Sequence, residues 1–399
     1  MIDLKAARND PETFRAALAR KGAGDAFDAL LSADERWRAL VPRIDELRGR
    51  TKVKGKPSPE QLADLQQVKE QLKAAEEELT AAEEQRDRLA LRVPNPPHAD
   101  VPDGSTEDDS LEVRRVGKPA ATDGAREHLE VGRFDMERAA RMSGARFGYW
   151  IGDTARLSLA LYRLALDRLA EKGFVTVLPP VLVREEALIG TGAFPSDEAN
   201  VYEVEADGLY LAGTAEIPLA SLHAGEILDR EELPLRYVAF SPCFRREAGA
   251  AGRDTRGMIR VHQFNKVEQF SLTRPEDSWD EHERLLANTE EIVAVLGLPY
   301  RVVVLPAGDM SSASAKTYDV EIWFPSQERY RETASISNTT DFQARRLGIR
   351  YRGERGVEPV HTLNGTAVVD RMALAILENF QGEVPHVLRP YGAPERVTA

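Results

Sequence analysis

Two long stretches near the start of the chain carry small or apolar residues at alternating steps of three and four. The members of the first are Leu30, Ala33, Trp37, Leu40, Ile44 and Leu47, and those of the second are Leu65, Val68, Leu72, Ala75, Leu79 and Ala82. Such spacing is typical of the seam between two packed helices. We therefore predict an antiparallel coiled coil over about residues 30–93, within a helical domain that spans residues 1–97.

Capping signals predict where these two helices begin. Ser32 with Glu35 forms one candidate capping box, and Ser58 with Gln61 forms another. The second helix would span roughly 34 residues, or about 50 Å at 1.5 Å per residue. A proline inside a helix usually kinks it, so we expect a bend at Pro42.

The predicted turn between the two helices is rich in cations, although the chain as a whole is acidic. Its basic residues are Arg48, Arg50, Lys52, Lys54 and Lys56. A net charge of −13 argues against general affinity for nucleic acid, so any such contact must come from a local basic patch. The turn is either that patch or a solvated tip whose charges only aid solubility.

The remainder of the chain predicts a second, larger domain. Residues 98–125 contain Pro, Gly and an acidic cluster and indicate a linker, and a new pattern runs from residue 126 to residue 399. Helices are expected over residues 156–172 and 372–380, and strands near residues 174–178, 236–240, 261–270, 300–305 and 319–323. Consecutive strands joined by hairpins, with helices outside, indicate an α+β fold.

Composition narrows the class of protein. With 399 residues, 42% of them hydrophobic and 30% charged, the chain can bury a large core. No run of 18 apolar residues occurs, which argues against a membrane span. The lone Cys243 excludes an intramolecular disulfide and argues against a thiolate zinc site, and we expect a cytoplasmic protein.

The usual glycine-rich nucleotide loops, GxGxxG and GxxxxGK[ST], do not occur, so phosphate binding would need another device. Arginine forks match phosphate oxygens, and Arg245 lies at the end of a predicted strand in the segment CFRREAG. If that strand continues, Glu247 points the same way as Arg245. The two could hold a phosphate and an amino-bearing base, or they could form a structural ion pair.

Four long segments together resemble seryl-tRNA synthetases of the bacterial type. They are TAEIPLASLHAGEI, SPCFRREAGAAGRDTRGMIRVHQFNKVEQF, AKTYDVEIWFPSQERYRETASISNTTDFQARR and TLNGTAVVDRMALAILENFQ. The resemblance covers nearly the whole chain. It implies a class II synthetase antiparallel sheet with flanking helices in a catalytic domain over residues 126–399, together with the N-terminal arm. It also implies a homodimer, because Pro180 matches the proline that ends motif 1 at the family's dimer interface.

The activity implied by the resemblance is that of an ATP-dependent, AMP-forming serine–tRNA ligase. Such an enzyme makes seryl-adenylate and transfers serine to tRNA(Ser), and to tRNA(Sec) where that tRNA is present. The arm would grip the tRNA, which favours phosphate contacts at the basic turn. Two alternatives are an amino acid:carrier-protein ligase and a duplicate synthetase serving specialised metabolism or inhibitor resistance.

For ATP, the resemblance assigns roles to residues of motifs 2 and 3. Arg245 would hold the α-phosphate and the serine carboxylate, and Glu247 would accept a hydrogen bond from the adenine amino group. Phe264 and Arg371 would cover the two adenine faces. The complete ATP set is Arg245, Arg246, Glu247, Val261, Phe264, Glu332, Thr333, Ala334, Ser335 and Arg371, with Arg245 and Arg371 as the catalytic pair.

For serine, the resemblance places the segment Thr214–Glu216 at the amino group and Glu268 with Thr366 around the hydroxyl. The complete serine set is Thr214, Ala215, Glu216, Arg245, Glu268, Asn364 and Thr366. Glu332 and Ser335 match the ligands of the Mg²⁺ that accompanies ATP. A carboxylate plus a hydroxyl is a sparse set of the kind that Mg²⁺ accepts when phosphates and water complete its coordination.

Motif 3 departs from the pattern of its relatives in two ways. Asn364 and Arg371 are seven steps apart, one fewer than is usual. Asp370 also places a carboxylate where small or neutral residues are more common. Because a one-residue deletion reverses the facing of side chains in a strand, either Thr366 is displaced or the neighbouring backbone absorbs the loss.

Overall fold

The computed structural model describes residues 1–52, 58–248, 257–354 and 356–398. The chain divides into two compact units, Met1–Pro96 and Pro97–Ala399, called here the arm unit and the body. None of the described helices is long and apolar enough to cross a membrane.

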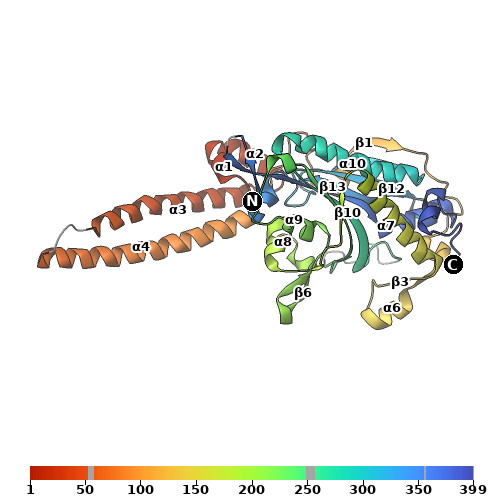
Figure 1. Cartoon of the computed structure of the whole chain (residues 1–399), viewed down its shortest axis with the longest axis horizontal. Coiled ribbons are helices and arrows are strands. Elements are labelled where there is room, and N and C mark those ends of the chain that lie inside the picture. Colours follow the sequence, from red (N-terminus) through yellow and green to blue (C-terminus); the bar gives the residue numbers. More distant parts are fainter. Residues whose placement is uncertain (53–57, 249–256, 355, 399) are drawn as a thin grey trace. The chain divides into compact units, whose positions relative to one another are not determined.

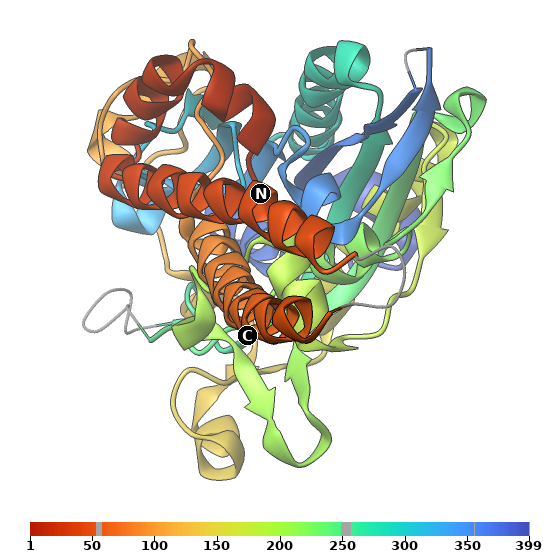
Figure 2. The same ribbon diagram turned by 90° about the vertical axis from the view of Figure 1, so that its left-hand side faces the viewer.

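Helices make up the arm unit. They are α1 (Leu4–Asn9), α2 (Pro11–Ala19), α3 (Gly24–Arg50) and α4 (Pro59–Arg92), with α3 and α4 side by side as a hairpin (Figure 1; Figure 2). The Ser58–Gln61 capping box is confirmed, because each side chain accepts a hydrogen bond from the backbone N–H of the other residue. The predicted box at Ser32 is wrong: α3 begins at Gly24 and Ser32 lies inside it. α3 also continues as a helix through Pro42.

Two separate apolar clusters stabilise the arm unit. The distal seam between α3 and α4 contains Ile44, Leu47, Val68 and Ala75, in the predicted spacing. The basal cluster at the other end contains Leu18, Phe27, Leu30, Ala90 and Val93. Burial of Phe27 and Leu30 in this basal cluster contributes about 1.5–3 kcal/mol for each side chain. That burial explains why α3 begins well before Ser32.

The body is built on a sheet that has eight strands within the described residues. In spatial order they are β1 (Leu111–Val116), β11 (Tyr300–Val304), β12 (Lys316–Phe324), β13 (Arg329–Asn338), β16 (His361–Val369), β10 (Gln263–Thr273), β9 (Leu235–Phe244) and β4 (Val175–Val177). Neighbouring strands are antiparallel except for β4 and β9, which are parallel. The predicted α+β class is confirmed.

Residues 98–125, whose composition indicates only a linker, also contain a strand of the body. β1 lies within this range and pairs with β11 at one edge of the large sheet. All six of its residues are exposed, so the strand lacks the alternation of buried and exposed positions that reveals a strand in a sequence. The segment therefore contributes an edge strand to the body.

Three long helices pack against the large sheet and bury most of the core: α7 (Asp153–Glu171), α10 (Ser278–Val295) and α12 (Asp370–Phe380). Shorter helices are α5 (His128–Val131), α6 (Met136–Ser143), α8 (Glu185–Thr191), α9 (Glu216–Ser221) and α11 (Phe342–Leu347). Short strands form small sheets of β5 (Leu182–Val183), β7 (Leu209–Leu211) and β6 (Tyr202–Val204), of β15 (Gly356–Pro359), β14 (Arg350–Gly353) and β8 (Ile227–Leu228), and of β2 (Phe134–Asp135) and β3 (Tyr149–Trp150).

Candidate active site

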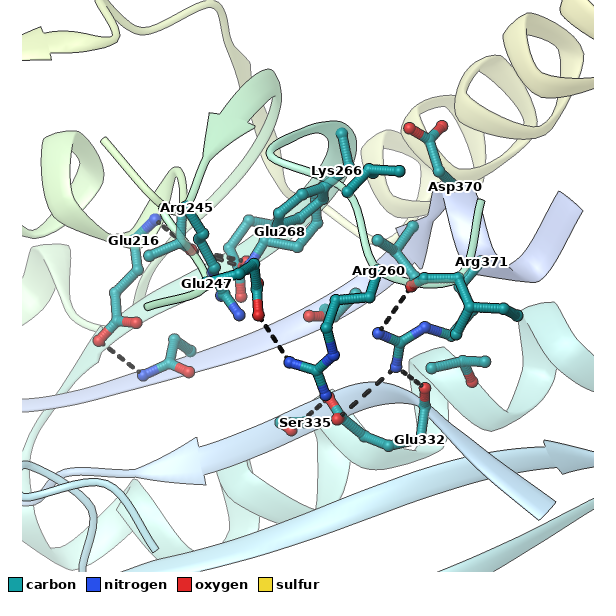
Figure 3. Close-up of a pocket in the computed structure, with 18 of the residues that line it drawn as sticks. Glu216, Arg245, Glu247, Arg260, Lys266, Glu268, Glu332, Ser335, Asp370 and Arg371 are labelled. Carbon is teal, nitrogen blue, oxygen red and sulfur yellow. Dashed lines mark hydrogen bonds and ion pairs between the residues drawn. The ribbon is translucent and has the colours of Figure 1, made fainter. Parts of the chain in front are cut away.

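Successive side chains of β10 point to opposite faces of the sheet, one face packed against α10 and the other lining a cavity. Gln269 faces α10, where its amide donates to the Leu285 carbonyl at 3.2 Å. Phe264, Lys266 and Glu268 instead line a cavity of roughly 320 Å³ (Figure 3). Side chains of β13, β16 and the start of α12 complete the walls of this cavity, so strands that are distant in the sequence form one site.

Most of the predicted site residues meet in this cavity. Those that line it are Thr214, Glu216, Arg245, Glu247, Val261, Phe264, Glu268, Glu332, Thr333, Ser335, Asn364, Thr366 and Arg371. Three others do not line it. Ala215 and Ala334 are buried in apolar clusters, and the Arg246 guanidinium lies over the Tyr202 ring, 5.8 Å from its centroid.

Arg245 and Glu247 reach the cavity by a different route from the one predicted. β9 ends at Phe244, and Glu247 has a φ of 53°, so the two residues do not share a strand face. The left-handed conformation is uncommon for a residue with a side chain, and it turns the Glu247 carboxylate toward the cavity. Arg260 donates to Glu247 Oε2 at 2.6 Å.

One end of the cavity has an aromatic ring and two guanidinium groups as its walls. The Arg245 guanidinium lies 5.3 Å from the centroid of the Phe264 ring, and its Nε donates to the Gly213 carbonyl at 3.3 Å. Arg371 donates to the backbone carbonyls of Glu332 and Ile259. A flat ring with a guanidinium group over its face is suited to an aromatic base, and guanidinium groups are suited to phosphate.

The other end of the cavity is a buried polar network. Lys266 forms an ion pair with Glu268, and its Nζ donates to Thr214 Oγ1 at 2.7 Å. The Thr214 hydroxyl donates to Glu268 Oε2 at 3.1 Å. Sequence reasoning missed Lys266, although it alternates with Phe264 and Glu268 along one strand and therefore shares their face.

Glu216 is the second carboxylate of this network and is half-buried. Its Oε1 accepts hydrogen bonds from Gln343 at 2.6 Å and from Asn364 at 3.0 Å. Burial, together with the nearby negative charge of Glu268, raises the pKa of Glu216 to about 7. Glu216 is therefore poised to ionise when a cationic group enters the cavity.

Two β-bulges bring critical side chains onto the cavity face. The pairing of β12 with β13 skips Thr333, so Glu332 and Ser335 face the same way despite being three residues apart. The pairing of β10 with β16 skips Ala367, so Thr366 pairs with Glu268 and lines the cavity. The backbone thus accommodates the shortened motif 3 without turning Thr366 away.

The chemistry around Glu332 suits a divalent cation. Ser335 Oγ lies 3.4 Å from Glu332 Oε1, and the neighbouring Asp319 is buried, with no hydrogen-bond partner for its Oδ1 in the part of the chain that the structure describes. Burial and the Glu332 carboxylate raise the pKa of Asp319. No cluster of three or more acidic, His or Cys side chains in the described ranges could hold a metal alone. Glu332 and Ser335 would therefore hold Mg²⁺ together with ligands from phosphate and water.

The basic turn of the arm is only partly described. Arg48 forms an ion pair with Glu76 at 2.9 Å, and Arg50 lies 3.8 Å from Asp64, so α4 neutralises both in part. Lys52 is exposed. The predicted contacts Lys54 and Lys56 lie outside the described residues.

Two family models match the chain. The seryl-tRNA synthetase N-terminal domain matches residues 1–97, and the tRNA synthetase class II core domain (G, H, P, S and T) matches residues 201–380. A serine–tRNA ligase of Pelotomaculum thermopropionicum is 44% identical and aligns over 98% of both chains. Serine–tRNA ligase 1 of Streptomyces avermitilis is 46% identical over 98% of this chain and 97% of its own.

Solved structures show the same likeness. Seryl-tRNA synthetase of Pyrococcus horikoshii, complexed with ATP, matches with a TM-score of 0.94 and 40% identity over 100% of this chain and 99% of its own. A cytoplasmic serine–tRNA ligase of Naegleria fowleri, in complex with AMP, matches with a TM-score of 0.89 and 33% identity over 99% and 97% of the two chains. Both units of this chain therefore have counterparts in these relatives.

Proposed function

This chain belongs to the seryl-tRNA synthetase family, and we propose that it activates serine with ATP and transfers it to tRNA(Ser), and to tRNA(Sec) where that tRNA occurs. It is an ATP-dependent, class II aminoacyl-tRNA synthetase. The observation that carries the proposal is a single cavity with two chemically distinct ends. One end is a slot for a nucleotide, with arginine and aromatic side chains as its walls. The other end is a polar network of the Glu216 and Glu268 carboxylates, the Thr214 hydroxyl and the Lys266 ammonium group.

The first step joins serine to AMP. A serine carboxylate oxygen attacks the α-phosphorus of ATP, the bond from that phosphorus to the bridging oxygen breaks, and pyrophosphate leaves. Arg245, beside Phe264 at the nucleotide end of the cavity, donates to both the serine carboxylate and the α-phosphate. Its fixed charge stabilises the negative charge that builds up on the phosphate oxygens in the transition state.

ATP is held by its base and its phosphates. Phe264 and Arg371 cover the adenine faces, and Glu247, fixed by Arg260, accepts from the adenine amino group. Glu332 and Ser335 would hold Mg²⁺, which when bound would supply positive charge to neutralise the phosphates. The Arg371 guanidinium contacts Glu332, which places it close to this group of phosphate-binding side chains.

Serine selectivity follows from the buried network. Glu216 accepts the serine ammonium group, and Glu268 with Thr366 surrounds the hydroxyl. Alanine lacks the hydroxyl that Glu268 and Thr366 surround, and a site built to hydrogen-bond a hydroxyl rejects such an analogue by a factor of about 10⁴. In the second step, a ribose hydroxyl of the tRNA attacks the seryl carbonyl carbon, and AMP leaves with the electrons of the broken mixed-anhydride bond.

A second copy of the chain covers an apolar face of the body. Leu159, Val175, Leu178 and Leu182 are large apolar side chains between 45% and 78% exposed. They lie on α7, β4 and β5 and in the segment around Pro180, so their positions match the dimer-forming motif 1 of the family. We place this homodimer in the cytoplasm, where ATP and tRNA are available, and light scattering would measure its mass.

ATP–pyrophosphate exchange with each of the twenty amino acids tests the proposed function. We expect serine alone to support rapid exchange. A carrier-protein ligase is not favoured, because the N-terminal tRNA-synthetase domain is present. Rapid exchange with another amino acid and none with serine would contradict the assignment of the buried network.

Serine binding is expected to strengthen as the pH rises. The pKa of Glu216, raised to about 7 from 4.5, leaves this carboxyl mostly protonated at pH 6 and mostly ionised at pH 8. The ionised form pairs with the serine ammonium group, so KM for serine should fall about tenfold between these pH values. The measurement is the exchange rate against serine concentration at each pH, with saturating ATP.

Glu216→Gln should raise KM for serine at pH 8 and remove most of its pH dependence. Glu203→Gln is the matched control, because Glu203 is exposed on β6 away from the cavity. A pH dependence as steep in Glu216→Gln as in the wild type would show that another group binds the ammonium.

A further inference from the structure

Asp370 is a buried carboxylate at the first position of α12, and its side chain is directed away from Arg371 (Figure 3). The backbone N–H of Asn265 donates to its Oδ2 at 2.8 Å. Its Oδ1 accepts from the hydroxyl of Tyr162 and lies 3.3 Å from Ser158 Oγ, both on α7. The carboxylate therefore joins three elements: α12, β10 and α7.

These hydrogen bonds connect the two walls of the nucleotide slot. Asn265 directly follows Phe264, and Asp370 directly precedes Arg371. The bond between Asn265 and Asp370 thus lies one residue from each wall and fixes the distance between them. Tyr162, which packs against Phe240 with ring centroids 5.0 Å apart, anchors the same carboxylate to the core.

The carboxylate is held without a cationic partner among the described residues. Of the charged side chains on the elements packed around it, Lys266 pairs with Glu268 and Arg371 with Glu332, and the titratable group that faces it from α7 is Tyr162. Burial raises the pKa of Asp370 to about 7, while the Asn265 N–H and Ser158 oppose that rise. An unpaired buried carboxylate is costly, so packing alone does not account for it.

We propose that Asp370 is a positioning residue that fixes the separation of Phe264 and Arg371 and thereby sets the affinity for the adenine of ATP. This inference rests on the proposed function, because it takes the slot to be the ATP site. A carboxylate that accepts from both β10 and α7 holds the start of α12 in place. The two walls are then already spaced for the base before ATP enters, and no binding energy is lost in ordering them.

Asp370→Ala is expected to raise KM for ATP by about tenfold, since small displacements of positioning groups have effects of this size. KM for serine should stay within about twofold, because the serine network does not include Asp370. Asp370→Asn retains a carbonyl oxygen for the Asn265 N–H and should restore KM for ATP to within about threefold of the wild type. ATP affinity measured by calorimetry gives the same comparison without turnover.

The pH profile separates positioning from a general loss of stability. An ionised carboxylate accepts hydrogen bonds more strongly than a protonated one, so KM for ATP in the wild type should fall from pH 6 to pH 8. Asp370→Asn should show a flat profile. Glu281→Ala is the matched control: Glu281 is a buried carboxylate that joins α10 to β10 through Ser271 at 2.9 Å, outside the cavity, so its loss should lower Tm without changing KM for ATP.

Several results would overturn the inference. One is an unchanged KM for ATP in folded Asp370→Ala, and another is an equal rise in KM for ATP and for serine. If Asp370→Ala does not fold, Asp370→Asn tests the proposal instead. A KM for ATP that falls as steeply with pH in Asp370→Asn as in the wild type would then count against it. Wild-type protein without serine-dependent exchange would instead contradict the proposed function, and calorimetry with ATP would still test Asp370.

Discussion

Arg245→Ala is expected to abolish serine-dependent ATP–pyrophosphate exchange while the protein stays folded. The Arg245 side chain is exposed and contacts the Gly213 carbonyl and the Phe264 ring, so its removal leaves the core intact. In the proposed mechanism its guanidinium contacts both reacting partners. Removing one such preorganised donor typically costs a factor of about 10² to 10³ in rate, and here the same group also orients the serine carboxylate.

Two further variants make this prediction sharper. Arg245→Lys keeps the charge but loses the planar fork, so we expect only a small part of the exchange rate to return. Arg274→Ala is the control, because Arg274 pairs with Asp277 on the surface, 2.6 Å away and outside the cavity. Exchange by Arg245→Ala within about threefold of the wild type would show that the role given to Arg245 is wrong.

Removal of the distal arm is expected to separate the two half-reactions. Residues 38–85 can be replaced by a short glycine linker, because Arg86 lies over the Trp37 ring at 4.2 Å and the basal cluster of Leu30, Ala90 and Val93 remains. Serine-dependent exchange should stay within about twofold. Charging of tRNA should fall by at least about a hundredfold, because the variant lacks the arm that we propose to contact the tRNA phosphates.

A charge variant tests the basic turn within the full-length protein. Lys52, Lys54 and Lys56 changed together to glutamine should weaken tRNA binding and flatten its salt dependence by roughly one counterion for each lost phosphate contact. Glutamine at Lys69 and Lys73, two basic residues of α4, is the control. An unchanged salt slope for the triple variant would identify the turn as a solvated tip.

The bounds of a helix could be predicted from the sequence where its capping residues and its packing against other elements favour the same bounds. The apolar residues spaced three and four apart, together with the capping box at Ser58, predicted the bounds of α4. The packing of the apolar seam and the hydrogen bonds of the cap favour the same helix. The start of α3 was not predictable in this way. Its first turns are stabilised by Phe27 and Leu30 in the basal cluster, a tertiary contact that outweighs the capping signal at Ser32.

The candidate site was harder to predict because its geometry depends on irregular backbone. Glu332 and Ser335 share a face only through the bulge at Thr333, and a regular strand would place them on opposite faces. Glu247 reaches the cavity through a left-handed residue rather than a continued strand. A resemblance to relatives could suggest these residues, but periodicity could not.

Lys266 and Asp370 show the opposite case, in which the signal was present in the sequence. Lys266 lies midway between Phe264 and Glu268 on one strand, so strict alternation places it in the cavity. Asp370 stood out as an unusual carboxylate, but its partners Tyr162 and Asn265 are distant in sequence, and only the fold brings them together.

Charging of tRNA with serine is the activity that we propose for this chain. The most direct test incubates purified full-length protein with ATP, Mg²⁺, radioactive serine and a tRNA(Ser) transcript, and then measures acid-precipitable radioactivity. We expect serine-charged tRNA in an amount close to that of the acceptor, with none when ATP is omitted or when tRNA(Ala) replaces tRNA(Ser). Rapid exchange of pyrophosphate with serine, but no label on tRNA(Ser), would contradict it.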